Sequence, residues 1–366
     1  MARNRSSNIE LCRIIIMLMI ILHHAVLHGG GVGMEYCTNK LIAFFFLPGG
    51  KIAFDTFIVI SMWFFVDQEF RADRLIKVYL IAIFFSILMM AASCLYSHGG
   101  GIRPIDIISG LLPVSGKMHG FIQTYIAFYL LFPFISKTSK GMTKEQNLYI
   151  ILVFSLFVFS FQILASLTWS GQSVYCRLIL FIFFFYLIRY IKYYCPHFAT
   201  NLKLNIILFL TAMCLDEAIT YLNLFAPTLY ILKYQGLVLG DESRILNVLA
   251  GTSLFFIFYN LKMPTSKVIN WLGSTTLAVL MIHDSDFFRI YTWDIFKTTE
   301  WFYSKYYLIL LIFSSIVIYL FCSMVDFIRR ILFNKFILSS KIIINFEKKL
   351  ETIFPKDKGS CTKSVG

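Results

Sequence analysis

The stretch IELCRIIIMLMIILHHAVLH, residues 9–28, decides the fold class. It is long enough to cross a bilayer as an α-helix, because about 20 residues rising 1.5 Å each span roughly 30 Å of hydrocarbon. A basic start before an apolar stretch also suits a secretory signal, but Arg13, His23 and His24 interrupt it and no small-x-small cleavage site follows. We therefore predict a retained first membrane helix.

Nine more apolar runs follow this one, near 42–65, 75–96, 117–136, 148–168, 174–191, 204–222, 244–261, 268–284 and 305–323. The chain of 366 residues is 58% hydrophobic and only 14% charged, whereas a soluble domain carries about 25% charged residues. Since lipid cannot satisfy free backbone groups, the runs are predicted to be helices. The expected fold is all-α, a polytopic transmembrane helical bundle with about ten membrane-spanning helices. The ninth run is short at its ends, and 223–243 has room for a re-entrant piece.

The net charge of +13 would suit a nucleic-acid binder, but Lys and Arg lie in short clusters between the apolar runs. Such clusters set membrane topology, so no nucleic-acid partner is expected. With the N-terminus inside, the inner side collects the larger share of Lys and Arg, and both termini are predicted to be cytoplasmic. The eight Cys form no CxxC pair, so the sequence predicts neither a metal site nor a disulfide framework.

The C-terminal region differs from the rest. Residues 1–326 are predicted to form one transmembrane domain, and residues 327–366 a cytoplasmic amphipathic helix and disordered tail. From Asp326 to Phe354, Ile, Leu and Phe are mixed with Lys and Arg, a composition that suits a helix lying on anionic lipids of the inner leaflet. The final dozen residues, rich in Lys, Ser and Gly, are predicted to be disordered. No soluble domain is expected at either end.

The first helix carries the main candidate for chemistry. Arg13 and His24 are eleven residues apart, which places them about 20° apart around a helix and roughly 16 Å apart along it. One face thus offers a cation near the cytoplasm and a base nearer the outside, and charged groups inside a membrane are expensive enough to indicate function. Equally open is a structural interpretation, in which Arg13 reaches the interface and His23 and His24 are satisfied within the bundle.

Two further sets of residues are candidates. Arg71 and Arg74 are three apart at the start of a helix, so their forked guanidinium groups can converge on a phosphate, although a topological anchor explains them fully and is the commoner case. Asp55 is predicted to lie at the level of His24, where a carboxylate would orient the imidazole. The other polar candidates in outer helix halves, each more often structural than catalytic, are His119, Asp216, Glu217, His283 and Asp284.

These segments together resemble the acyltransferase family 3 membrane proteins, which O-acylate bacterial surface polysaccharides and related acceptors. The family's first helix has an Arg and a His separated by ten residues, like Arg13 and His24, and its RxxR motif is similar to 71–74 (Arg-Ala-Asp-Arg). Residues 51–61, 117–122 and 280–284 resemble further landmarks, and the likeness covers roughly residues 8–325. Met62 replaces a frequent Gly and Gly120 a frequent Trp, which puts the substrate in doubt more than the activity.

The resemblance implies that the transmembrane domain is an acyltransferase of the bacterial inner membrane. The donor substrate would be acyl-CoA, in the first instance acetyl-CoA, with no permanently bound cofactor. The acceptor would be a hydroxyl of a cell-surface glycan or its lipid-linked precursor. The implied site has Arg71, Arg74 and Arg13 on the CoA phosphates, His24 as base with Arg13 and Asp55, and His119, His283 and Asp284 on the acceptor side. An acyl-imidazole intermediate and direct transfer both remain open. The competing class is a polysaccharide or lipid-linked sugar transporter or flippase, which shares the helix count and basic loops but has no reason to hold the Arg–His spacing with the RxxR.

Overall fold

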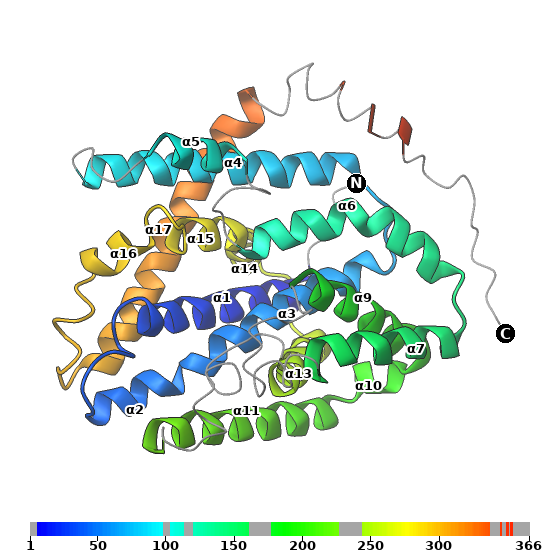
Figure 1. The fold of residues 1–366 in the computed structure, drawn as a ribbon, viewed down its shortest axis with the longest axis horizontal. Helices are drawn as coiled ribbons and strands as arrows, with labels where there is room; N and C mark the ends of the chain where they lie inside the picture. Colours follow the sequence, from blue (N-terminus) through cyan, green and yellow to red (C-terminus); the bar gives the residue numbers. More distant parts are fainter. Residues whose placement is uncertain are drawn as a thin grey trace.

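The computed structural model describes residues 6–97, 103–112, 120–160, 177–226 and 244–336, with a few positions near the C-terminus at 345, 349–350 and 352–353. These parts are helical and contain no strand, so the predicted all-α class is confirmed for them (Figure 1). Three predicted features fall outside the described residues: His119, most of the re-entrant candidate at 223–243, and the disordered tail.

Four helical segments of the described chain are long and apolar enough to cross a membrane. They are α1 (Ser7–Leu27), α2 with α3 (Thr38–Phe45 and Leu47–Phe65), α4 (Ala72–Tyr96), and α17 (Tyr307–Phe336), whose apolar part is Tyr307–Phe333. Each of the six other predicted runs overlaps a described helix as well. The chain is therefore a multi-helix membrane protein, while a count of ten crossings stays a prediction.

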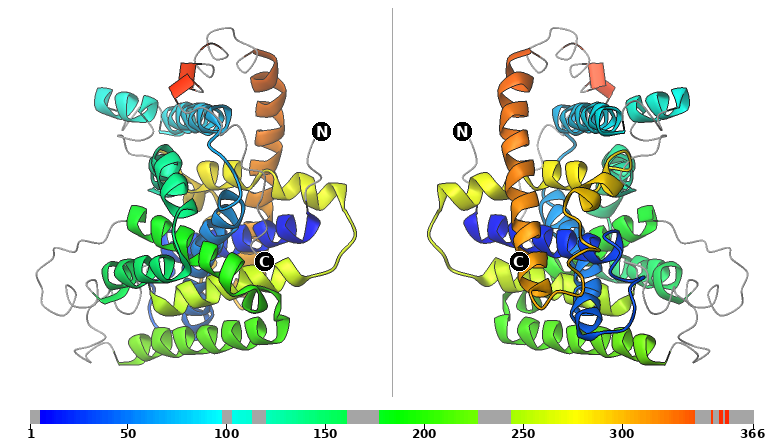
Figure 2. Two further views of the ribbon diagram at one scale, coloured as in Figure 1. Left: turned by 90° about the vertical axis from the view of Figure 1, so that its right-hand side faces the viewer. Right: turned by 90° about the vertical axis from the view of Figure 1, so that its left-hand side faces the viewer.

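The central pair of the bundle is α1 and α3, which lie side by side (Figure 1). Helix α1 also contacts α13, α14, α15 and α17, so segments from the N-terminal and C-terminal parts of the chain meet around it. Helix α11 lies along one edge of the bundle and α4 with α5 toward the opposite side (Figures 1 and 2). The remaining helices are α5 (Pro104–Leu111), α6 (Gly120–Lys140), α7 (Lys144–Ser155), the π-helical turn η1 (Leu156–Ser160), α9 (Arg177–Tyr194), α10 (Pro196–Thr200), α11 (Leu202–Phe225), α13 (Ile245–Asn260), α14 (Lys267–Gly273), α15 (Thr276–His283) and α16 (Arg289–Ile295).

Aromatic rings fill the core between α3, α6 and α9. Phe65 of α3 lies with its ring centroid 6.1 Å from that of Phe128 and 5.3 Å from that of Phe132, both on α6. The same two rings contact Phe185 of α9 at 6.1 Å each. Such pairs add roughly 0.5–1.5 kcal/mol each beyond the area they bury. This cluster holds α3, and with it one wall of the site, in a fixed position.

The ninth predicted run is interrupted in the structure. Helix α14 ends at Gly273, and α15 starts at Thr276 after a short turn. The buried hydroxyl of Thr275 donates to the Leu272 carbonyl and hydrogen-bonds the Ser323 hydroxyl of α17 at 2.8 Å, so the turn is satisfied inside protein. Irregular backbone at membrane depth is tolerated under this condition. The break places the C-terminal end of α15 beside α1.

Helix α17 continues without a break across the predicted domain boundary at 326–327. Asp326 is buried and accepts hydrogen bonds from Arg329 and Arg330, both at 2.7 Å. Arg330 also donates to the Ser274 carbonyl in the turn between α14 and α15. The first basic residues of the predicted tail thus belong to the folded bundle, because they neutralise a buried carboxylate and satisfy the exposed backbone of that turn.

Candidate active site

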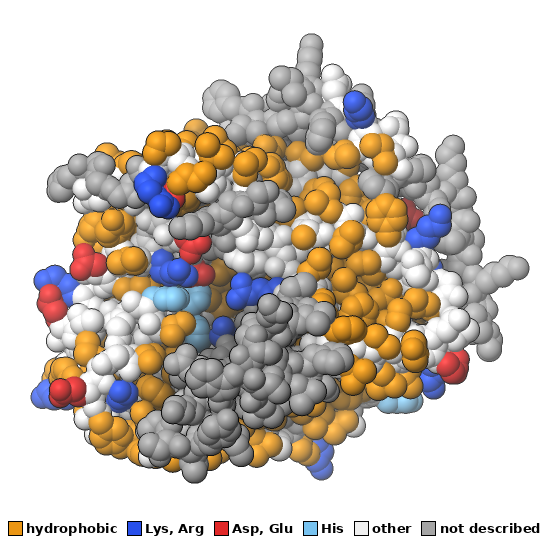
Figure 3. Space-filling model, viewed as in Figure 1, with side chains coloured by type: hydrophobic (Ala, Val, Ile, Leu, Met, Phe, Trp, Pro, Cys, Tyr) orange, Lys and Arg blue, Asp and Glu red, His pale blue; other side chains and the backbone are white. Residues whose placement is uncertain are grey.

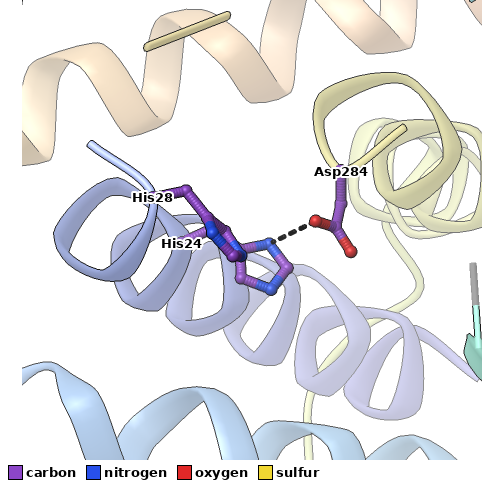
Figure 4. Close-up of side chains that lie close together, drawn as sticks. All are labelled: His24, His28 and Asp284. Carbon is purple, nitrogen blue, oxygen red and sulfur yellow. Dashed lines mark ion pairs between the residues drawn. The ribbon is translucent and has the colours of Figure 1, made fainter. Parts of the chain in front are cut away.

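The centre of the candidate site is His24, in the last turn of α1 (Figure 4). Its Nδ1 lies 3.1 Å from Nε2 of His283 and 3.6 Å from Oδ1 of Asp284. His283 ends α15 and Asp284 follows it, and Figure 4 shows the Asp284 carboxylate directed at the His24 ring. The His24 and Asp284 side chains are 14% and 17% exposed, so the pair is largely shielded from solvent yet reachable.

Hydrogen bonding fixes which nitrogen of His24 is basic. Nδ1 of His283 lies 2.6 Å from the Val279 carbonyl, which can only accept, so this nitrogen carries the proton of the neutral ring. Nε2 of His283 is then an acceptor, and Nδ1 of His24 must donate to it. The lone pair of neutral His24 is therefore on Nε2. A proton taken up there gives an imidazolium that the Asp284 carboxylate stabilises.

A cavity of about 340 Å³ joins His24 to Arg13 along one face of α1, as the eleven-residue spacing predicts. Three cations and one carboxylate are among its lining residues: Arg13, Lys51, Arg177 and Asp284. Figure 3 shows basic and His side chains gathered around a hollow on this face of the molecule. Phe54, Phe57, Ile20 and Leu280 supply apolar walls. A basic chamber with apolar walls suits an anionic ligand with an uncharged, extended arm.

Arg13 lies at the other end of the cavity from His24 along α1. Its Nη1 is 3.3 Å from Oε1 of Glu10, one turn earlier, and Glu10 is buried. The Arg13 side chain is 27% exposed and lines the cavity. Glu10 therefore anchors the Arg13 guanidinium through Nη1 at the cavity wall.

The structure separates the two Arg residues of the RxxR segment. Arg71 makes a two-point contact with Asp73, at 3.0 Å and 2.7 Å, on the surface. Arg74 instead donates to the Gln68 side chain and stacks over the Phe65 ring at 5.7 Å. The Phe65 ring lies with its centroid 5.9 Å from that of Tyr125, and Tyr125 lines the cavity. Arg74 is thus connected to the cavity wall through Phe65 and Tyr125.

Asp55 packs against α13 in the described structure. It is fully buried on α3, where Gly251 of α13 packs so closely that an added Cβ would come within 2.8 Å of the Asp55 Cβ. The carboxylate beside His24 belongs to Asp284 instead, and Asp55 is absent from the described lining of the cavity. Of the predicted acceptor-side residues, His283 and Asp284 are brought to His24, whereas the structure does not describe His119.

Arg177 is a cavity residue that sequence reasoning missed. It starts α9, and its Nη1 fills the space beside Gly120 that a Cβ at this position would need. Its guanidinium also lies over the Phe54 ring at 5.7 Å. Two signals were present: Arg177 is a cation near the start of the apolar run 174–191, and Gly120 departs from the frequent Trp. Only the fold shows that the Arg177 side chain occupies the space beside Gly120.

The two other imidazoles of α1 have different surroundings. Nδ1 of His23 lies 2.6 Å from the Leu47 carbonyl at the start of α3, so this ring ties α1 to α3. His28 follows the last residue of α1, and its ring centroid lies 5.2 Å from that of His24.

Fold and site together define a helical membrane protein with a His cluster beside a basic cavity. An acyltransferase-domain family model matches residues 6–325, almost the whole described chain. The chain therefore belongs to acyltransferase family 3, and the resemblance seen in the sequence is confirmed. No curated protein and no solved structure matches the chain.

Proposed function

We propose that this protein is a membrane O-acyltransferase that moves an acyl group, in the first instance acetyl, from cytoplasmic acyl-CoA to a hydroxyl of a cell-surface glycan or its lipid-linked precursor. The bacterial inner membrane is the proposed location. One observation carries the proposal: His24, oriented through Nδ1 by His283 and Asp284, shares a basic cavity with Arg13. An acyl-transfer reaction needs such a base next to a channel for an anionic donor.

In the proposed reaction, His24 Nε2 removes the proton of the acceptor hydroxyl as its oxygen attacks the thioester carbonyl. The new C–O bond forms, the C–S bond breaks, and the imidazolium returns its proton to the departing thiolate, which leaves as free CoA. Asp284 and His283 support the imidazolium through the Nδ1 side. General-base catalysis of this kind contributes about 10²–10⁴-fold in rate. Transfer through an acyl-imidazole uses the same residues and gives the same products.

The donor's phosphates are proposed to bind at the far end of the cavity from His24. Arg13 lines the cavity, and Arg74 lies over the Phe65 ring next to the cavity residue Tyr125, which supports a role for both. Arg71 would also bind a phosphate of the donor after giving up its contact with Asp73. The exchange is possible because a carboxylate and a phosphate each present two oxygens to the guanidinium fork. Roughly 16 Å separate Arg13 from His24 along α1, a distance the extended arm of the donor would occupy.

The proposed topology has ten crossings with both termini in the cytoplasm, which puts Arg74 on the donor side. Membrane lipids would contact the outer helix faces and the basic C-terminal segment. A reporter fused after residue 366 should then behave as cytoplasmic, and a Cys introduced at Thr38 should react with an impermeant thiol reagent from outside. An external C-terminus would contradict the even number of crossings.

The deciding experiment uses the purified protein in lipid vesicles with acetyl-CoA. Free CoA thiol should appear only when a glycan or lipid-linked acceptor is added, and the acceptor should gain the mass of one acetyl group per modified unit. The His24→Ala variant in equal amount is the matched control. Movement of a labelled sugar lipid across the bilayer, with no thiol release, would instead support the transporter class.

A further inference from the structure

We propose that His24, His28 and Asp284 form a binding site for a zinc-type divalent cation, and that cation binding switches off His24 as a base. One ligand atom from each residue lies within 4.8 Å of those of the other two (Figure 4). His24 and His28 are four residues apart, which places them on one face of the α1 terminus. Asp284 reaches the same point from the end of α15.

The chemistry of these three groups suits zinc better than a hard cation. Zinc takes imidazole nitrogens at about 2.0–2.1 Å and carboxylate oxygens at about 2.0–2.2 Å, which puts neighbouring ligand atoms roughly 3.3 Å apart. The present separations are at most 4.8 Å, so a small rotation of the side chains would complete the site. Three protein ligands leave the fourth tetrahedral position to water or substrate. Magnesium prefers oxygen ligands in an octahedral arrangement and should bind poorly.

Either nitrogen of His24 links cation binding to loss of the base. A cation on Nε2 occupies the lone pair directly. A cation on Nδ1 displaces the proton now donated to His283, and in the neutral ring that proton moves to Nε2. In both cases no lone pair remains to accept the proton of an acceptor hydroxyl. The blocking part of this inference rests on the proposed function, whereas cation binding itself does not.

Arg289 provides a variant that should strengthen cation binding, whereas loss of a ligand residue should weaken it. Its Nη1 lies 3.1 Å from Oδ1 of Asp284, the same oxygen that faces His24, and its Nη2 lies 3.0 Å from Asp286. A guanidinium at this position competes with a metal ion for the carboxylate and repels its charge. Removing the guanidinium should therefore strengthen cation binding, which a general loss of structure could not do.

The experiment measures zinc affinity of the full-length, metal-stripped protein in detergent by competition with a fluorescent zinc indicator. The variants are His28→Gln, Asp284→Asn and Arg289→Gln. Their matched control is His23→Gln, since Nδ1 of His23 is engaged by the Leu47 carbonyl. The His28 and Asp284 variants should bind zinc at least about tenfold more weakly. The Arg289 variant should bind it more tightly, His23→Gln should bind it like the parent, and magnesium should not compete.

Thermal melting without metal checks that each variant is folded, and zinc should raise the melting temperature of the parent protein more than that of His28→Gln. Equal zinc affinity in the parent, His28→Gln and Asp284→Asn would overturn the site. His28-dependent zinc binding without inhibition of acyl transfer would overturn the blocking step. If zinc binds in this His28-dependent way while no preparation transfers an acyl group, the metal site stands and the proposed function fails.

Discussion

The His24 end of the cavity and the Arg71–Arg74 segment are built in opposite ways. His24 meets a partner 259 residues away in the sequence, and the two residues lie on α1 and α15. Arg71 is held by Asp73, two residues away, with both side chains about half exposed at 56% and 44%. The comparison teaches that the His24 imidazole is oriented by the tertiary fold, whereas Arg71 is oriented by Asp73, a neighbour in the sequence. An exposed contact of this kind can be exchanged for another ligand.

The largest effect is expected from His24→Ala. Loss of the proposed base should lower the rate of acetyl transfer by about 10²–10⁴-fold, because the attacking hydroxyl keeps its proton. Thiol release in vesicles measures this rate, and insertion is checked from the amount of folded protein. His23→Ala should be much milder, since His23 ties α1 to the Leu47 carbonyl. Equal and modest losses in the two variants would show that both imidazoles are structural.

A smaller effect is expected from changing the residue that orients His24. His283→Phe removes the acceptor for the His24 Nδ1 proton and should lower kcat by about tenfold or more, with little change in the KM for acyl-CoA. His283→Gln retains a carbonyl oxygen as acceptor and should recover part of that loss. If the Phe and Gln variants have the same kcat, the hydrogen bond to Nδ1 does not contribute.

At the donor end, the two Arg residues should differ. Arg74→Lys keeps the charge but loses the forked geometry, so we expect the KM for acyl-CoA to rise about tenfold. Arg71→Lys should raise it less, because its exposed pair with Asp73 already competes with phosphate. A double Lys variant with unchanged acyl-CoA dependence would reduce the segment to a topological anchor.

The smallest effect on turnover is expected from Asp55→Asn. Asp55 is buried against α13 and lies outside the described cavity lining, so this change should mainly lower thermal stability. Asp284→Asn should instead lower kcat, because the proposed imidazolium loses its carboxylate. The kcat and melting temperature of both variants are compared. A larger kcat loss in Asp55→Asn would restore Asp55 as the partner of His24.

The sequence alone determined whatever depends on local pattern. Apolar length and the scarcity of charge determined the all-α membrane class, since lipid leaves the backbone no other economical choice. The period of a helix placed Arg13 and His24 on one face, and the structure has both at one cavity. The same motifs indicated the family, which the match over residues 6–325 confirms.

Only the tertiary structure decided which distant groups meet. Asp284 rather than Asp55 lies beside His24 because the break between α14 and α15 brings the end of α15 to α1. Arg177 enters the cavity because Gly120, on another helix, has no side chain to exclude it. Helical periodicity fixes directions around a single axis, but it carries no information on how two helices are placed relative to each other. That placement follows from close packing summed over many weak contacts along the whole chain.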